Sequence, residues 1–186
     1  MKYPGRVQVS VRYTLNDSKL KVQFEAHLDA EQKKSTPINL TNHSYFNLAG
    51  HTSENGILSH ELEVYADHYT PTDSASIPTK EAKSLDEVPS MDFRKAKQID
   101  AALRELAAAS GYSAEETEDA IQRKGRGASE PLGFDHNYCL NFFHSAGEYA
   151  NCPIRAIAKL SHRESGRVMK VSSTSPGVQV YTGNYI

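Results

Sequence analysis

Eight histidines are the side chains of this sequence best suited to proton transfer, because imidazole changes its charge near neutral pH. They are His27, His43, His51, His60, His68, His136, His144 and His162. A histidine taken alone is most often structural or solvent-exposed. Two of the eight, His43 and His136, have sequence neighbours that indicate a functional role.

His43 lies in the run NLTNHSYFNL, residues 39–48, where amides and hydroxyls flank it and Tyr45 and Phe46 follow. Such a cluster offers hydrogen-bond partners for the hydroxyls of a sugar and apolar rings for its faces. The alternative reading is an asparagine-rich turn after a strand.

His136 lies in the run GFDHNY, residues 133–138. The neighbouring Asp135 could set the tautomer of this histidine or raise its pKa, although adjacent side chains of a strand point to opposite faces. The alternative reading is the start of a strand after a glycine turn.

Other catalytic chemistry has less support. The sequence has no G-x-S-x-G elbow and no H-E-x-x-H zinc motif. No pair of carboxylates is marked out for glycoside hydrolysis. Cys139 and Cys152 form neither a disulfide framework nor a paired zinc motif, so we expect free thiols in a reducing compartment.

Length and charge narrow the class of protein. The chain has 186 residues, enough for one domain, and its 21 Lys plus Arg against 23 Asp plus Glu give a net charge of −2. No basic stripe indicates a nucleic-acid partner. The absence of an apolar signal core and of a membrane-length apolar run predicts a soluble, cytoplasmic protein with no membrane partner.

Alternating apolar residues predict a mainly antiparallel all-β fold. Residues 7–15 and 20–28 read as a hairpin with one buried and one exposed face, joined by a turn at 16–19. Further strands are predicted at 38–40 and 61–69. Residues 70–96 read as an ordered loop. Later strands are predicted at 154–160, 168–171 and 178–181, with a turn at 163–166.

A short helical region interrupts this β pattern at about residues 99–124. Apolar residues at i, i+4 and i+7 predict a first helix that ends at Gly111, and Ser113 with Glu116 forms a capping box for a second helix. We interpret the charged stretch 100–130 as a helical insertion on the surface of the β protein.

Several motifs occur in an order that is specific for one family. They are TPINLTNHSYFNLAG (36–50), ADHYTP (66–71), IPT (77–79), DFRK (92–95), GFDHN (133–137), SGRV (165–168) and SPGVQVYTGNY (175–185). Together they resemble the aldose 1-epimerases of the galactose mutarotase type. The resemblance covers nearly the whole chain except the helical stretch.

The resemblance implies a β-supersandwich, here a single partial domain over residues 1–186 that is incomplete at both ends. It implies interconversion of the α and β anomers of galactose, glucose and similar aldoses by acid–base ring opening, a step of hexose metabolism. The implied partner is a small aldose, and neither a metal nor an organic cofactor is expected. The oligomeric state is not indicated.

The resemblance also assigns roles to four residues. His136 corresponds to the proton donor to the ring oxygen. His43 corresponds to the second active-site histidine, which contacts the substrate oxygens. Asn137 and Tyr138 stand where the family lines its sugar pocket.

The family pattern includes groups that this sequence does not contain. An Asn-Arg pair is expected before the first histidine, and an aspartate and the general-base glutamate are expected beyond Ile186. We therefore expect a central fragment with weak or no activity. Two alternatives stay open: a carbohydrate-binding relic without catalysis, and an epimerase of phosphorylated sugars that uses Arg94 and Lys95.

Overall fold

The computed structural model describes residues 3–29, 31, 35–123, 132–141 and 152–185. The chain divides into two compact units, Met1–Phe46 and Asn47–Ile186. Each unit is described by itself below. The single domain over residues 1–186 and the surface insertion at 100–130 stay predictions.

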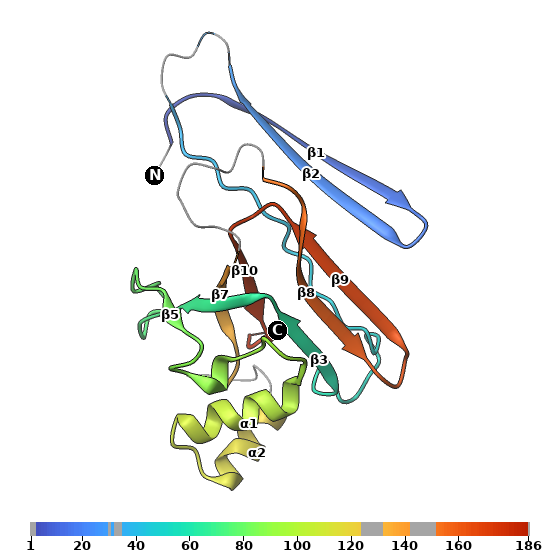
Figure 1. The fold of residues 1–186 in the computed structure, drawn as a ribbon, viewed down its shortest axis with the longest axis vertical. Coiled ribbons are helices and arrows are strands. Elements are labelled where there is room, and N and C mark those ends of the chain that lie inside the picture. The colour runs from blue at the N-terminus through green and yellow to red at the C-terminus, as the bar shows by residue number, and fades with distance from the viewer. Residues whose placement is uncertain (1–2, 30, 32–34, 124–131, 142–151, 186) are drawn as a thin grey trace. The chain divides into compact units, whose positions relative to one another are not determined.

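The first unit is built on one hairpin (Figure 1). Strands β1 (Val7–Asn16) and β2 (Lys19–Leu28) pair antiparallel along their whole length, which confirms the predicted hairpin. Asp17 adopts a φ of 50° in the turn, a conformation that Asp tolerates better than most residues.

The prediction that one face of this hairpin is buried is wrong in this structure. The apolar side chains that alternate along the two strands are largely exposed, among them Val9, Val11, Tyr13, Leu15 and Leu20. The reason is that, in the part of this unit that the structure describes, the sheet has two strands and no second layer of the unit covers its apolar face.

The strand predicted at 38–40 does not form, since the structure has residues 35–46 as irregular chain. Polar side chains there bond to the backbone locally: the Ser44 N–H donates to Asn42 Oδ1 at 2.9 Å. Such bonds compete with the ladder bonds of a sheet.

The second unit contains two four-stranded antiparallel sheets, with strand orders β10-β7-β4-β5 and β6-β3-β8-β9. Their bounds are β3 His60–Val64, β4 Ala66–Thr70, β5 Lys83–Ser84, β6 Lys97–Gln98, β7 Asp135–Leu140, β8 Arg155–His162, β9 Arg167–Ser173 and β10 Gly177–Tyr181. The strands predicted after residue 153 are confirmed.

One predicted strand, 61–69, is divided between the two sheets at Tyr65. The Tyr65 N–H donates to the Ile157 carbonyl at 2.9 Å, and the Tyr65 carbonyl accepts the Asn141 N–H at 3.4 Å. The chain therefore turns a corner at this residue, with β3 on one side and β4 on the other. Strands that change sheets at a corner are a known way to join two layers.

The predicted helices are confirmed as α1 (Ile99–Ala109) and α2 (Ala114–Arg123), and a 3-10 turn η1 (Pro89–Met91) precedes them. The capping box forms in both directions: the Glu116 N–H donates to Ser113 Oγ at 3.2 Å, and the Ser113 N–H donates to Glu116 Oε2 at 2.8 Å. Gly111 follows α1 with a φ of 83°.

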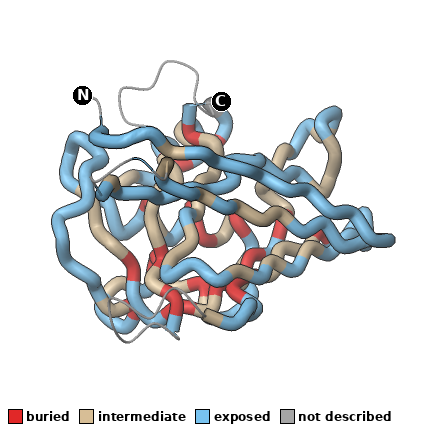
Figure 2. Tube along the Cα trace, turned by 90° about the horizontal axis from the view of Figure 1, so that it is seen from above, coloured by how far each residue is buried: buried red, intermediate tan, exposed pale blue. Residues whose placement is uncertain are grey.

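The core of the second unit draws on both sheets and on α1, where the buried positions of Figure 2 gather. Phe93 and Phe134 meet edge to face in it, with ring centroids 5.0 Å apart. Leu62 of β3, Tyr138 of β7 and Leu103 of α1 belong to the same cluster. This core fixes the inner face of β7, the strand that carries His136.

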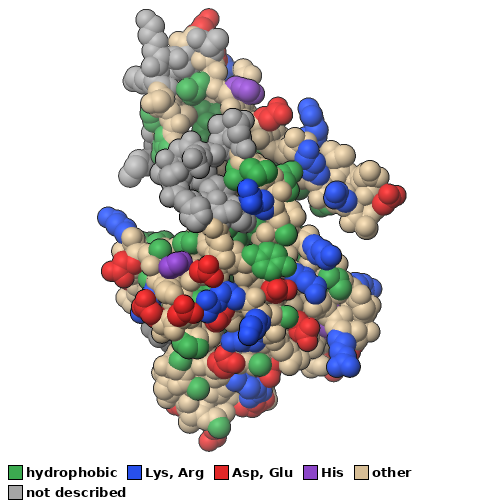
Figure 3. Space-filling model, viewed as in Figure 1, with side chains coloured by type: hydrophobic (Ala, Val, Ile, Leu, Met, Phe, Trp, Pro, Cys, Tyr) green, Lys and Arg blue, Asp and Glu red, His purple; other side chains and the backbone are tan. Residues whose placement is uncertain are grey.

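On the surface of the second unit, cations and carboxylates are interspersed (Figure 3). Arg94 pairs with Asp86 at 2.6 Å and with Asp92 at 2.8 Å. Arg104 pairs with Asp100 at 2.9 Å. Among the described residues, no helix has the length and apolarity needed to cross a membrane.

Candidate functional site

Strand β7 positions His136 and Asn137 between two neighbouring strands. It pairs antiparallel with β10 on one side and with β4 on the other, so that His136 lies opposite Val180, and Asn137 opposite Thr70. An inner strand bonded on both edges holds its side chains more rigidly than a loop does.

The His136 ring is partly buried and oriented by two neighbours. Its Nδ1 accepts the backbone N–H of Asp135 at 3.3 Å. The Tyr69 ring meets it edge-on, with centroids 5.7 Å apart and an interplanar angle of 74°. Because Nδ1 is an acceptor, the neutral imidazole carries its proton on Nε2, which is the nitrogen left to donate.

Burial lowers the pKa of His136, and the charge of Asp135 opposes this shift only in part. The Asp135 carboxylate is engaged elsewhere, since it accepts Gln179 Nε2 at 2.8 Å. The sequence suggested that Asp135 could raise the pKa of His136. The charge of Asp135 does act in that direction, but burial lowers the pKa by more than Asp135 raises it.

Asn137 points to the opposite face of β7 from His136. Its Nδ2 donates to Thr70 Oγ1 at 3.0 Å. Gly177 lies against its side chain, so closely that a Cβ at Gly177 would overlap Asn137 Oδ1. The side-chain amide of Asn137 is thus hydrogen-bonded to β4 on one side. On the other side it packs directly against Gly177 of β10.

Tyr138 is fully buried, and its hydroxyl donates to the Met91 carbonyl at 2.8 Å. Burial raises the pKa of this hydroxyl. The side chain forms part of the core beneath the strand, where it presents no surface to a ligand. This buried position does not support the prediction that Tyr138 lines a sugar pocket.

Two of the family-like motifs are bonded to each other, a relation that sequence reasoning missed. Thr182 Oγ1 accepts the Phe134 N–H at 2.9 Å and donates to Asn184 Oδ1 at 2.6 Å. Asn184 Nδ2 donates back to the Phe134 carbonyl at 3.3 Å. A Cβ at Gly133 would overlap Asn184. The YTGN motif therefore fixes the chain just ahead of His136.

His43 belongs to the Met1–Phe46 unit, whereas His136 belongs to the other. His43 is exposed, with its ring centroid 5.2 Å from that of Tyr45. The aromatic and polar neighbours predicted for His43 are therefore present locally. The structure does not relate the positions of the two histidines.

The remaining histidines differ from one another. His27, His51 and His68 are exposed, and His144 lies outside the described residues. His60 and His162 are buried and stack on each other, with ring centroids 4.8 Å apart. The sequence does carry one signal for this pair, because His60 alternates with Leu62 and Val64 on the buried face of β3.

One thiol lies beside a candidate residue, since Asn137 Nδ2 is 3.9 Å from Cys139 Sγ. Across the part of the chain that the structure describes, no three His, Cys, Asp or Glu side chains come close enough together to hold a metal ion. Cys139 and Cys152 are both free and half-buried, which confirms the prediction of free thiols.

Sequence comparison gives a match over the whole chain. The family model described as "Aldose 1-epimerase" matches residues 1–186. The chain is 38% identical over 184 residues to the galactose mutarotase of Bos taurus, covering 99% of this chain and 43% of the relative. It is 33% identical over 185 residues to the aldose 1-epimerase of Escherichia coli K12, covering 99% of this chain and 44% of the relative.

Structural comparison agrees with the sequence match. The crystal structure of galactose 1-epimerase from Lactobacillus acidophilus is similar with a TM-score of 0.64 and 28% identity, covering 98% of this chain and 43% of that one. The predicted galactose mutarotase-like fold is confirmed for that share. The chain thus spans less than half the length of the relatives that it matches.

Proposed function

Because this chain belongs to the aldose 1-epimerase family, we propose that it carries the histidine part of a site that interconverts the anomers of galactose or glucose. The observation that carries the proposal is the arrangement of His136. Its Nδ1 accepts a backbone N–H, so Nε2 of this partly buried ring carries the proton and is the nitrogen that can donate it.

In the proposed reaction, a base removes the proton of the anomeric hydroxyl while His136 gives a proton to the ring oxygen. The bond between C1 and the ring oxygen breaks, and an open-chain aldehyde forms. Rotation about C1–C2 exposes the other face of the aldehyde, and closure returns both protons. One positioned acid or base contributes about 10²–10⁴-fold in rate.

The lowered pKa of His136 suits this role in one respect. Its imidazolium form is a stronger acid than that of an exposed histidine, so it releases a proton to the ring oxygen more readily. The neutral form can still donate a hydrogen bond from Nε2 to the same oxygen. In the proposal, His43 contacts further substrate oxygens, whereas Asn137, which faces the other side of β7 and is bonded to Thr70, does not share the His136 site.

Tyr138 has a different role in the proposal from the one that the sequence suggested. Its buried ring and its bond to the Met91 carbonyl support β7 from the core side. We assign it to holding His136 and Asn137 in place, without contact to the sugar.

A sugar-phosphate substrate is a weaker alternative. It would use Arg94 and Lys95; Lys95 is exposed, and the Arg94 guanidinium already lies within 4.0 Å of the carboxylates of Asp67, Asp86 and Asp92. A cation with three carboxylate neighbours has little attraction left for an anion. A non-catalytic carbohydrate-binding protein is the second candidate function.

Polarimetry of freshly dissolved α-D-galactose tests the catalytic proposal. Any acceleration by the chain above the buffer rate should be abolished in His136→Ala, and it would show that another group of the chain supplies the base. His68→Ala is the matched control, an exposed histidine on neighbouring strand β4. Acceleration by the wild-type chain that His136→Ala leaves intact would refute the assignment. No acceleration by folded wild-type chain would mean either a fragment that does not contain its general base or a carbohydrate-binding relic.

A further inference from the structure

Tyr69 lies on the same face of its sheet as His136. It is paired directly with Tyr138 across β4 and β7, and His136 comes two residues before Tyr138, so the three side chains point to one side of the sheet. The rings of Tyr69 and His136 meet nearly at right angles, at 74° with centroids 5.7 Å apart. Aromatic pairs favour this geometry. Both residues lie in the Asn47–Ile186 unit.

The ring of His136 needs a packing contact of this kind to keep one orientation. The terminal χ2 torsion of histidine is soft, so the torsion itself does not fix the ring. The hydrogen bond to Nδ1 comes from the Asp135 N–H at 3.3 Å, which is long for such a bond. Among the described residues, Nε2 has no hydrogen-bond partner that would fix a second point of the ring. One long hydrogen bond leaves the ring free to turn unless a neighbouring side chain blocks it.

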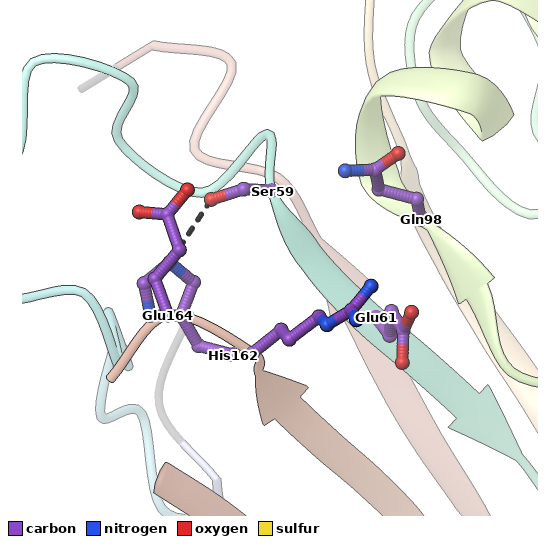
Figure 4. A pocket seen from close by; sticks show the side chains of 6 residues that line it. Ser59, Glu61, Gln98, His162 and Glu164 are labelled. Carbon is purple, nitrogen blue, oxygen red and sulfur yellow. Dashed lines mark hydrogen bonds between the residues drawn. The ribbon is translucent and has the colours of Figure 1, made fainter. Parts of the chain in front are cut away.

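His162, in the other sheet, is held in a different way. Its Nδ1 accepts the Ser165 N–H at 3.3 Å, so its proton is on Nε2, which donates to Ser59 Oγ at 3.1 Å. Figure 4 shows Ser59 and His162 on the wall of a polar pocket of about 240 Å³. Hydrogen bonds thus hold the His162 ring at both nitrogens. They hold the His136 ring at one nitrogen, so packing has to supply the second constraint.

Tyr69 is itself firmly held, as a side chain that positions another one has to be. It is buried, and its strand β4 is paired with β7 on one edge and with β5 on the other. Its ring centroid lies 6.4 Å from that of Tyr138, whose hydroxyl donates to the Met91 carbonyl at 2.8 Å. Neighbouring aromatic rings therefore lead from the core to His136, and Tyr69 is the one that contacts it.

We propose that Tyr69 is a positioning residue for His136. Its ring blocks rotation of the imidazole about χ2 and so keeps Nε2, the nitrogen that carries the proton, in one direction. The role rests on the proposed function, in which Nε2 donates to the ring oxygen of an aldose. Tyr69 acts through His136 and does not touch the sugar.

The test replaces Tyr69 in two ways. Tyr69→Leu keeps an apolar side chain and removes the ring, whereas Tyr69→Phe keeps the ring and removes only the hydroxyl. Leu62→Val, in the core but on β3 of the other sheet, is the control for a general loss of stability. In the full chain, ¹³C relaxation of the His136 ring measures its order, and chemical-shift titration measures galactose affinity.

The proposal predicts a clear difference between the two variants. In Tyr69→Leu, the order parameter of the His136 ring falls below about 0.6, and galactose affinity falls roughly twofold to tenfold. Tyr69→Phe keeps both readouts at the wild-type level. Leu62→Val lowers stability and leaves the His136 ring ordered. An equally ordered His136 ring in wild type and folded Tyr69→Leu would overturn the proposal, and so would an equal loss of order in Leu62→Val.

A measurement on the wild-type chain keeps the test decisive if Tyr69→Leu does not fold. Nuclear Overhauser effects between the ring protons of Tyr69 and His136, together with a single ordered orientation of the His136 ring, support the proposal. A His136 ring that averages between orientations beside an intact Tyr69 refutes it. Absence of galactose shifts in wild type would instead refute the proposed function, because the order measurements do not depend on sugar.

Discussion

The backbone N–H of Asp135 donates to Nδ1 of its neighbour His136 at 3.3 Å, so the tautomer of the candidate acid is set by the main chain. The Asp135 carboxylate turns the other way and binds Gln179. This follows from strand geometry, since adjacent side chains alternate while the backbone stays within reach of both.

The titration of His136 should reflect this arrangement. Burial lowers the pKa of His136, so its midpoint should lie below the free value of about 6.5. Asp135→Asn removes the charge that raises the pKa, so the midpoint should move further down. Imidazole ¹⁵N NMR reads both the midpoint and the tautomer. A midpoint at or above 6.5, or a proton on Nδ1 in the neutral form, would contradict the structure.

A side chain at Gly177 should displace the side chain of Asn137. Gly177→Ala places a Cβ onto Asn137 Oδ1, so the Asn137 side chain must rotate and give up its bond to Thr70 Oγ1, at a cost of about 0.5–1.5 kcal/mol. Urea unfolding should show the loss, and the side-chain amide signal of Asn137 should shift. Gly111→Asn is the control, because its φ of 83° suits Asn and nothing lies within 4 Å of its Cβ position. Equal stability of the two variants would refute the close contact.

Local patterns predicted much of this fold. The hairpin of β1 and β2 and the capping box of Ser113 and Glu116 depend on residues that are near one another in sequence, and both form as predicted. The corner at Tyr65 was missed because it depends on bonds to Ile157 and Asn141, far along the chain.

In the candidate site, too, the local sequence predicted some features, while contacts between residues far apart in sequence determined the others. A motif sufficed to select His136 and to place it at a strand start. It could not show that Tyr138 is buried, because that depends on Met91 and the core around it. The pairing of His60 with His162 was equally hidden, since it joins strands about a hundred residues apart.

Tyr138→Phe tests the supporting role of that residue. The change removes the hydroxyl and leaves the buried Met91 carbonyl without this donor, which costs about 1–3 kcal/mol in unfolding free energy. Galactose affinity should stay near wild type, since Tyr138 does not contact the sugar in our proposal. Tyr13→Phe, at an exposed position of the hairpin, is the control for stability. A large loss of affinity without loss of stability would show direct contact instead.

Acid should destabilise the second unit through His60. Burial and the neighbouring His162 lower the pKa of His60 in the folded state. Below about pH 6.5 the unfolded chain takes up the proton first, so the free energy of unfolding falls until the pH reaches the lower folded-state pKa. His136 contributes with the same sign.

His60→Gln should therefore lose less stability than wild type between pH 7.5 and 5. Urea unfolding at several pH values measures this slope. His68→Gln, at an exposed position of β4, should keep the wild-type slope. Other ionisable groups lie around His162, namely Glu61, Arg163 and Glu164. A wild-type slope in His60→Gln would mean that His60 does not account for the acid sensitivity.

The central claim is that His136 meets an aldose, and a ¹H–¹⁵N NMR titration of the chain with D-galactose tests it most directly. The account predicts saturable shifts of the His136 ring nitrogens that are kept in His68→Ala, and a loss of galactose affinity in His136→Ala, read from the remaining amide shifts. A folded chain whose His136 signals stay unmoved at saturating galactose would contradict it.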